Sequence, residues 1–189
     1  NNSLEVKPWE FAAYSQVKIE LDELIVNAGL RFDYFEPDFE VPVNLSLYHL
    51  EEVVDPITGL QISNRQTADP TYQISPRLGV AFPISEAGVM RFSAGLFFQT
   101  PQLNLLYTNN EFERSEGADR YTIGNANLEP ERTLQFEVGL QQGLSETMGL
   151  DLTVFSKDIR ELSGQTAVRG SIGAPVGRLE NIDYGTVKG

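Results

Sequence analysis

The stretch ISPRLGVAFPISEAGVMRFSAGLFFQ, residues 74 to 99, decides the fold. It divides at SEAG, residues 85 to 88, into two halves in which apolar side chains recur at every second position. Successive side chains of a β-strand point to opposite faces, so each half predicts a strand with one apolar face. The connection is short and contains a glycine, which predicts that the two strands form a β-hairpin.

The two faces of this hairpin differ in chemistry. One face carries the apolar residues Leu78, Val80, Phe82, Ile84, Met90, Phe92, Ala94, Leu96 and Phe98. The other face is small and polar and holds one arginine in each strand, which is unlike the inside of a soluble core. A long hairpin with two such faces is typical of a wall between lipid and water.

Composition and charge exclude several classes of function. No stretch approaches the run of about 18 apolar residues that a transmembrane helix needs, although barrel strands give a much weaker signal. The chain has no cysteine, which excludes disulfides and thiol chemistry. Its net charge of −13 argues against binding to nucleic acid, and against a peripheral protein held to anionic lipid by charge.

The hairpin pattern occurs three times and is followed by a single strand. The hairpins cover residues 9–35, 74–99 and 132–160, and the last strand covers 179–188. The connections are long and rich in Pro, Asn, Gly and acidic residues, and we expect loops over 36–73, 100–131 and 161–178.

This alternation of short and long connections is typical of outer-membrane barrels, which have short periplasmic turns and long extracellular loops. About ten residues at roughly 3.3 Å each, tilted near 45°, rise roughly 23 Å, which is close to the apolar band of such a barrel. Aromatic residues near the loop-side strand ends are expected to form an interfacial girdle: Trp9, Tyr34, Tyr72, Phe97 and Phe98. Amphipathic hairpins also build soluble sheets, so a soluble β-sheet binding module remains an alternative.

Several segments resemble the barrel of TonB-dependent outer-membrane receptors, most closely the subgroup with a carboxypeptidase-regulatory-like domain ahead of the plug. The matching stretches are NAGLRFDYFEPD (27–38), ISPRLGVAFPIS (74–85), RFSAGLFFQTPQLNLLYTN (91–109), GNANLEPERTLQFEVGLQQGLSETMGLDLTVFSKDIREL (124–162) and NIDYGTVKG (181–189). The resemblance implies a barrel of about 22 strands around a plug. It also implies import of a scarce ligand across the bacterial outer membrane, with energy relayed by TonB.

The sequence departs from this family in having about seven strands, no plug, no TonB-contacting box and no final strand that ends in an aromatic residue. Seven strands cannot close such a barrel, and open edges would leave backbone groups unpaired in lipid. We therefore expect an all-β, antiparallel segment of a transmembrane β-barrel, completed by further strands and a plug from the same receptor or a second chain. The alternative is a split-barrel subunit or fragment with a structural or assembly role among other outer-membrane proteins.

Alternation assigns residues to the two sides of this wall. The residues expected to face the lumen are Arg31, Asp33, Arg77, Arg91, Gln99, Glu137 and Gln141. The residues expected to face lipid are Leu24, Val26, Leu30, Phe32, Leu78, Val80, Phe82, Phe92, Leu96, Phe98, Phe136, Val138 and Leu140. The lumen set either guides a ligand, or docks the plug and forms ion pairs between strands. We expect Arg31 and Asp33 to pair with neighbouring strands.

No catalytic site is recognisable, and we predict no enzyme activity, cofactor or metal. The only histidine, His49, lies in an expected loop without a glycine-framed nucleophile. The acids Glu51, Glu52 and Asp55 could bind a divalent cation, but their spacing does not match an EF-hand and favours a solvated acidic loop.

The extracellular loops are the expected region of ligand contact. Their apolar run Leu103, Leu105, Leu106 and Tyr107 is either a binding surface or a segment packed over the barrel mouth. The identity of the ligand does not follow from the sequence, because specificity would lie in loops and plug residues that are variable or missing here.

Overall fold

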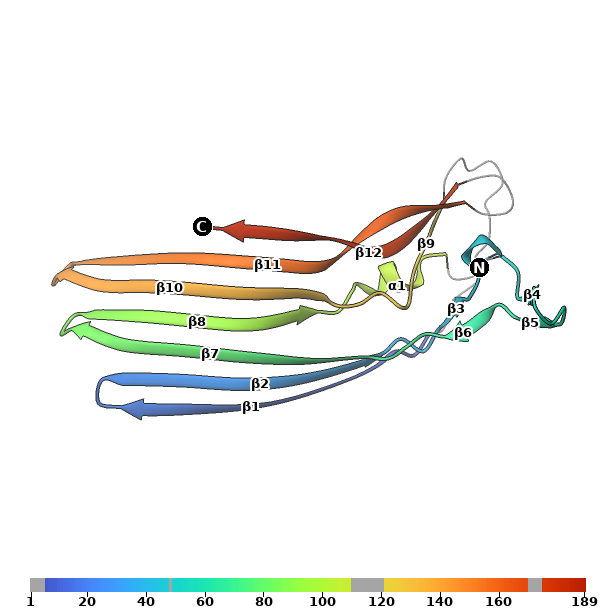
Figure 1. Cartoon of the computed structure of the whole chain (residues 1–189). Helices are drawn as coiled ribbons and strands as arrows, with labels where there is room; N and C mark the ends of the chain where they lie inside the picture. Colours follow the sequence, from blue (N-terminus) through green and yellow to red (C-terminus); the bar gives the residue numbers. More distant parts are fainter. Residues whose placement is uncertain (1–5, 48, 110–120, 170–174) are drawn as a thin grey trace.

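A computed structural model describes residues 6–47, 49–109, 121–169 and 175–189. One large sheet contains most of them, and seven of its strands are antiparallel, in the order β1-β2-β7-β8-β10-β11-β12 (Figure 1). The strand bounds are Trp9–Leu21 for β1, Leu24–Glu36 for β2, Thr71–Ser85 for β7, Gly88–Gln99 for β8, Glu131–Ser145 for β10, Met148–Arg169 for β11 and Pro175–Lys188 for β12. This is an open sheet of a β-barrel wall, as the alternation predicted.

The connections fall into two groups at opposite ends of the sheet. Three two-residue turns join β1 to β2, β7 to β8 and β10 to β11, and they lie together at one end (Figure 1). The long connections lie together at the other end, which we call the loop end. None of the described helices has the length and apolar character that a membrane span requires.

The register of the sheet keeps apolar residues opposite apolar residues. One row across six strands consists of Ile19, Val26, Val80, Phe92, Val138 and Val154. The next row consists of Lys18, Asn27, Gly79, Ser93, Glu137 and Phe155, and is mostly polar or small. A slip of one residue in any pair would bring apolar side chains into the polar face, so the pattern itself specifies the pairing.

The apolar face is open over the described residues. Phe92 is 41% exposed, Phe136 52% and Val154 56%, although the ring of Phe92 stacks on that of Phe82 at 5.8 Å. A continuous apolar face of this extent is not compatible with a monomer in water. The soluble alternative therefore has no physical support.

The expected loop over 36–73 contains short strands that the sequence did not reveal. β3 (Glu40–Pro42) pairs with β6 (Arg65–Thr67), and β4 (Glu52–Val54) pairs with β5 (Gln61–Ser63). A 3-10 helix over Leu45–Leu47 lies between them. Strands of three residues are too short for an alternating pattern to be recognised, which explains the difference.

The expected loop over 161–178 is largely strand. β11 continues to Arg169 and β12 begins at Pro175. A bulge with shifted register lies between Ile159 and Ser163, and Glu161 there has a φ of 58°. The bulge interrupts the alternation, and the segment beyond it carries no apolar stripe, so alternation does not predict a strand there.

Buried side chains gather at the loop end. Three small clusters consist of Phe35, Leu106, Tyr107 and Leu128, of Val41, Ala68 and Ala126, and of Ile123 and Val176. Phe39 packs against all three clusters and its ring meets that of Tyr107 edge to face at 5.5 Å. The described core is therefore a layer of packed loops above the wall.

Gly124 allows this layer to close. A Cβ at this position would lie 2.5 Å from the carbonyl oxygen of Leu106 and 2.7 Å from the amide nitrogen of Thr108. We therefore expect Gly124→Ala to lower the free energy of unfolding of the detergent-solubilised protein by about 1–3 kcal/mol. Gly29→Ala is the matched control, because its Cβ would meet the backbone of Ser15 at an ordinary 3.6 Å. Equal stability of the two variants would contradict the packing argument.

Candidate functional site

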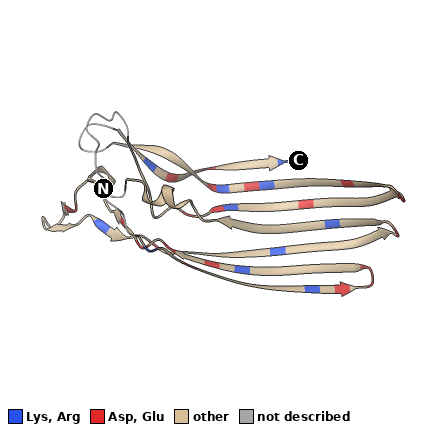
Figure 2. Ribbon diagram, turned by 180° about the vertical axis from the view of Figure 1, so that it is seen from behind, with Lys and Arg blue, Asp and Glu red and all other residues tan. Residues whose placement is uncertain are grey.

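The polar face of the sheet carries the seven residues expected to face the lumen. Strands β2, β7, β8 and β10 position them. The register places all seven on the face of the sheet away from the apolar rows: Arg31, Asp33, Arg77, Arg91, Gln99, Glu137 and Gln141. Charged residues are sparse along these strands and are more frequent near the loop end (Figure 2).

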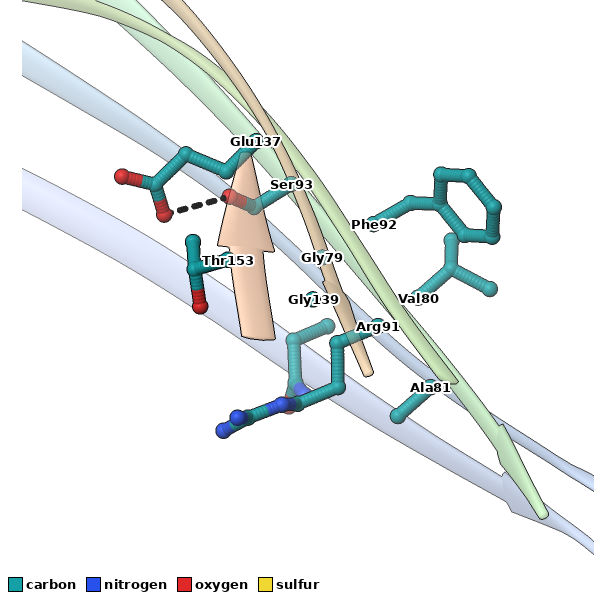
Figure 3. Close-up of a pocket in the computed structure, with 10 residues that line it drawn as sticks. Gly79, Val80, Ala81, Arg91, Phe92, Ser93, Glu137, Gly139 and Thr153 are labelled. Atoms are coloured by element: carbon teal, nitrogen blue, oxygen red, sulfur yellow. Dashed lines mark hydrogen bonds between the residues drawn. The ribbon is translucent and has the colours of Figure 1, made fainter. Parts of the chain in front are cut away.

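A hollow of about 320 Å³ lies on this face between β7, β8, β10 and β11. Arg91, Ser93, Glu137 and Thr153 project to one side of the sheet, and Phe92 projects to the other side (Figure 3). Gly139 lies between Arg91 and Thr153 in the register and has no side chain to fill the space.

The polar groups of the hollow are joined across strands. The guanidinium of Arg91 reaches past Gly139 to the carboxylate of Asp151 on β11, at 3.1 Å. The carboxylate of Glu137 accepts hydrogen bonds from the Ser93 hydroxyl, at 3.3 Å, and from the Gln135 amide. The arrangement is that of an exposed polar wall in which one ion pair and neutral hydrogen-bond donors satisfy the charged groups.

Two sequence expectations about this face are wrong. Arg31 forms its ion pair with Asp33 of the same strand, at 2.7–2.9 Å, because both side chains project from one face two residues apart. Phe97, which was expected in the aromatic girdle, lies on the polar face, where the Arg77 guanidinium covers its ring at 4.6 Å. The adjacent Phe98 belongs to the apolar face, as expected from alternation.

The other girdle residues lie on the apolar face at the loop end. The rings of Trp9 and Tyr34 meet edge to face at 5.4 Å, and Tyr34 lies directly opposite Tyr72 in the register. Amphipathic rings are characteristic of the boundary between lipid and water.

The stretch Gly124–Pro130 joins the loops, a role that sequence reasoning missed. The side chain of Asn127 accepts a hydrogen bond from the backbone of Asp69 at 2.9 Å, and Asn125 accepts one from the guanidinium of Arg178 at 3.2 Å. Between and after these asparagines, Ala126 and Leu128 are buried in two of the clusters. The alternation of asparagine with buried apolar residues was the available signal.

Two further asparagines hold the loop end together. Asn181 on β12 accepts a hydrogen bond from the Glu129 backbone and donates to the backbone carbonyls of Glu129 and Glu161, at 2.9–3.0 Å. Asn64 is fully buried, and its side chain bonds the backbone of Asn44 and of two residues near the 3-10 helix. These contacts join positions far apart in the sequence, so no local pattern predicts them.

The short strand β9, Tyr121–Ile123, attaches the β8–β10 connection to β12. It pairs in parallel with Val176–Arg178. The Gln165 side chain of β11 crosses above Gly177 and donates a hydrogen bond to the Thr122 hydroxyl at 2.8 Å. Burial lowers the pKa of Arg178 next to this junction, and the nearby Glu180 carboxylate opposes that shift.

The acidic loop near His49 is not arranged as a metal site. Among the described residues, no three His, Cys, Asp or Glu side chains are grouped to hold a metal ion. The carboxylate of Asp55 instead accepts hydrogen bonds from the backbone N–H groups of Ile57 and Thr58, which lower its pKa. Asp55 therefore stabilises a turn.

The apolar run of the β8–β10 connection packs inward over part of its length. It forms α1, Leu103–Tyr107, in which Leu106 is 1% exposed and Tyr107 is 9% exposed, whereas Leu103 is exposed. The Tyr107 hydroxyl donates a hydrogen bond to the carbonyl of Pro37, and burial raises its pKa. Packing, which was one of the two alternatives, accounts for Leu106 and Tyr107.

An antiparallel wall with one apolar and one polar face, short turns at one end and packed loops at the other, defines an outer-membrane type of β-barrel. The family model described as "TonB dependent receptor-like, beta-barrel" matches residues 2–189, and the chain belongs to this family. No curated protein matches the chain in sequence. The family consists of outer-membrane receptors and transporters, so the chain is not an enzyme.

Solved structures share the fold at low sequence identity. The Serratia marcescens hemophore receptor HasR, solved with its hemophore HasA and heme, has a TM-score of 0.65 and 17% identity over 97% of this chain and 31% of that chain. A variant of the Neisseria meningitidis FrpB iron transporter has a TM-score of 0.60 and 16% identity, over 95% of this chain and 22% of that chain. The Pseudomonas aeruginosa ferric enterobactin receptor PfeA has a TM-score of 0.55 and 16% identity, over 97% of this chain and 32% of that chain. The chain therefore spans about a third or less of these structures.

The Arg91–Asp151 ion pair is expected to contribute little to stability. Both side chains are about half exposed, at 48% and 54%, and exposed ion pairs are worth at most about 1 kcal/mol. A double-mutant cycle with Arg91→Gln and Asp151→Asn, measured by unfolding in detergent, should give a coupling free energy below about 1 kcal/mol that falls with added salt. A coupling above about 2 kcal/mol would require a buried pair and would contradict this description.

Proposed function

We propose that this chain forms part of the wall of an outer-membrane receptor that imports a scarce ligand. In this proposal the apolar face contacts lipid and the polar face lines the lumen around a plug. The missing strands and the plug come from the same polypeptide or from a second chain, and TonB supplies the energy. The carboxypeptidase-regulatory-like domain ahead of the plug stays a prediction.

One observation carries the proposal: the register keeps an apolar row and a polar row separate across six strands. In the two rows nearest the short turns the apolar side holds from β1 to β11, whereas nearer the loop end β11 places Ser156, Asp158 and Arg160 on that side. A wall of this kind is needed only where one face meets hydrocarbon and the other meets water. The structural neighbours include a receptor solved with heme, an iron transporter, a ferric enterobactin receptor and a copper transporter, which supports a scarce, metal-containing ligand.

The orientation of the faces is tested with two adjacent residues. Phe92→Cys and Ser93→Cys, each carrying a nitroxide spin label in the full receptor in bilayers, should report opposite environments. We expect oxygen, which dissolves in lipid, to relax the label at position 92, and a water-soluble nickel complex to relax the label at position 93. The reverse result, or equal access to the nickel complex, would overturn the assignment of faces.

Transport is tested in cells that express the full receptor. We expect accumulation of one of three supplied probes, heme, ferric enterobactin or copper, and loss of that accumulation when either the receptor gene or TonB is deleted. Detergent-solubilised receptor should also be captured on immobilised TonB. A receptor that neither binds TonB nor changes uptake of any probe would instead favour the structural role. An intact mass of the purified protein near the 21.1 kDa of this chain would then identify a separate subunit.

A further inference from the structure

Two arginines lie directly opposite each other on the apolar face at the loop end. Arg132 is the second residue of β10, and the register places it opposite Arg160 of β11. Two residues further along β10, on the same face, Leu134 begins the apolar series that continues with Phe136. On β11 the apolar series ends at Val154, and Ser156 and Asp158 follow on the same face before Arg160, so the arginine pair lies on the loop side of the apolar band.

Only one of these two arginines forms an ion pair among the described residues. Like charges directly opposite each other on neighbouring strands are destabilising. Asp158 bonds to Arg160 at 3.1 Å, whereas Arg132 forms no ion pair with any residue that the structure describes. The Arg160 side chain is 58% exposed, so an external group can reach it. Figure 2 places charged residues together where β10 and β11 approach the loop end.

We propose that Arg132 and Arg160 together bind the phosphate of a lipid headgroup in the outer leaflet. The proposal rests on the orientation given under the proposed function, in which the apolar face contacts lipid. Side chains of directly opposed residues begin only about 5 Å apart, so two guanidinium groups can bind one phosphate. Guanidinium groups match phosphate oxygens in paired, charge-assisted hydrogen bonds.

The surroundings favour a lipid over a soluble anion. Phe98 lies opposite Arg132 on the other side of β10, and Leu134 lies beside the pair, so apolar side chains are available for the acyl chains. Arginine at the edge of an apolar band places its charged end at the headgroup level. The net charge of −13 gives the protein no general attraction for anionic lipid, so binding at this place requires a local site.

The test uses the full receptor in bilayer nanodiscs of phosphatidylcholine, titrated with lipid A and read out by native mass spectrometry. We expect one retained lipid A, and at least about a tenfold loss of its affinity in the double variant Arg132→Gln/Arg160→Gln. Lys157→Gln is the matched control, because it removes one positive charge from the same strand on the opposite face and should leave the affinity unchanged. Asp158→Asn removes the competing acid and should tighten binding, which keeps the test valid if the double variant does not fold.

Several results would overturn the proposal. These are unchanged affinity in the double variant, an equal loss with Lys157→Gln, or equal binding of dephosphorylated lipid A. Full displacement of lipid A by millimolar inorganic phosphate would identify a site for free anions. Spin labels at positions 92 and 93 distinguish failure of the lipid site from failure of the proposed function. If the labels report the proposed orientation while the double variant binds lipid A as tightly as the unmodified receptor, only the lipid site is wrong.

Discussion

The backbone ladder from β1 to β11 is the constraint on which the rest of the structure depends. Because the side-chain period of a strand is two residues, a ladder in the correct register sorts every side chain onto one of two faces at once. The row that contains Val80, Phe92 and Val138 is apolar only because each strand is held at that position by its neighbour. The polar hollow around Arg91 and Glu137, and the apolar surface on the other face, are two consequences of the same ladder.

The long hairpins could be predicted from the sequence because each face of a strand keeps one chemistry over many residues. The pattern placed Leu78, Ala94 and Leu96 on the apolar face, and the register confirms that face by setting Leu78 opposite Ala94 and Leu96 opposite Leu134. It failed where that contrast is lost. β11 extends beyond the apolar band, and there Gln165 and Thr166, which are adjacent and so lie on opposite faces, are both polar, so the two faces show no contrast.

The contacts of the candidate site were harder to predict than its faces. Alternation placed Arg31 and Asp33 on the same side, but whether an arginine pairs along its own strand or across to the next depends on side-chain rotamers. Phe97 and Phe98 are adjacent aromatic residues, and only the register decides which one enters the polar face. The hydrogen bond between the Asn181 side chain and the Glu129 backbone joins residues 52 positions apart, so no spacing rule could have predicted it.

The loop layer gives the wall a rigidity that its hairpins alone would lack. Hydrogen bonds and buried side chains of the β8–β10 connection reach the β2–β7 connection through Asn127 and Tyr107, and reach β12 through Thr122, Asn125 and Glu129. One segment therefore ties the first hairpin to the last strand across the loop end. The asparagines in this segment satisfy backbone groups that no regular ladder reaches, which is a requirement for any loop that is buried.

The two edges of the sheet have backbone groups that need partners. In hydrocarbon, an unpaired row of backbone N–H and C=O groups is not tolerated. Among the described residues, β9 covers the outer edge of β12 only over Val176–Arg178, and no described strand covers the outer edge of β1. In the proposed receptor the remaining length of β12 would pair within the membrane with a strand from outside the described residues. That strand would leave the edge beside Arg178, where β9 ends, so the loop layer would limit how the barrel continues.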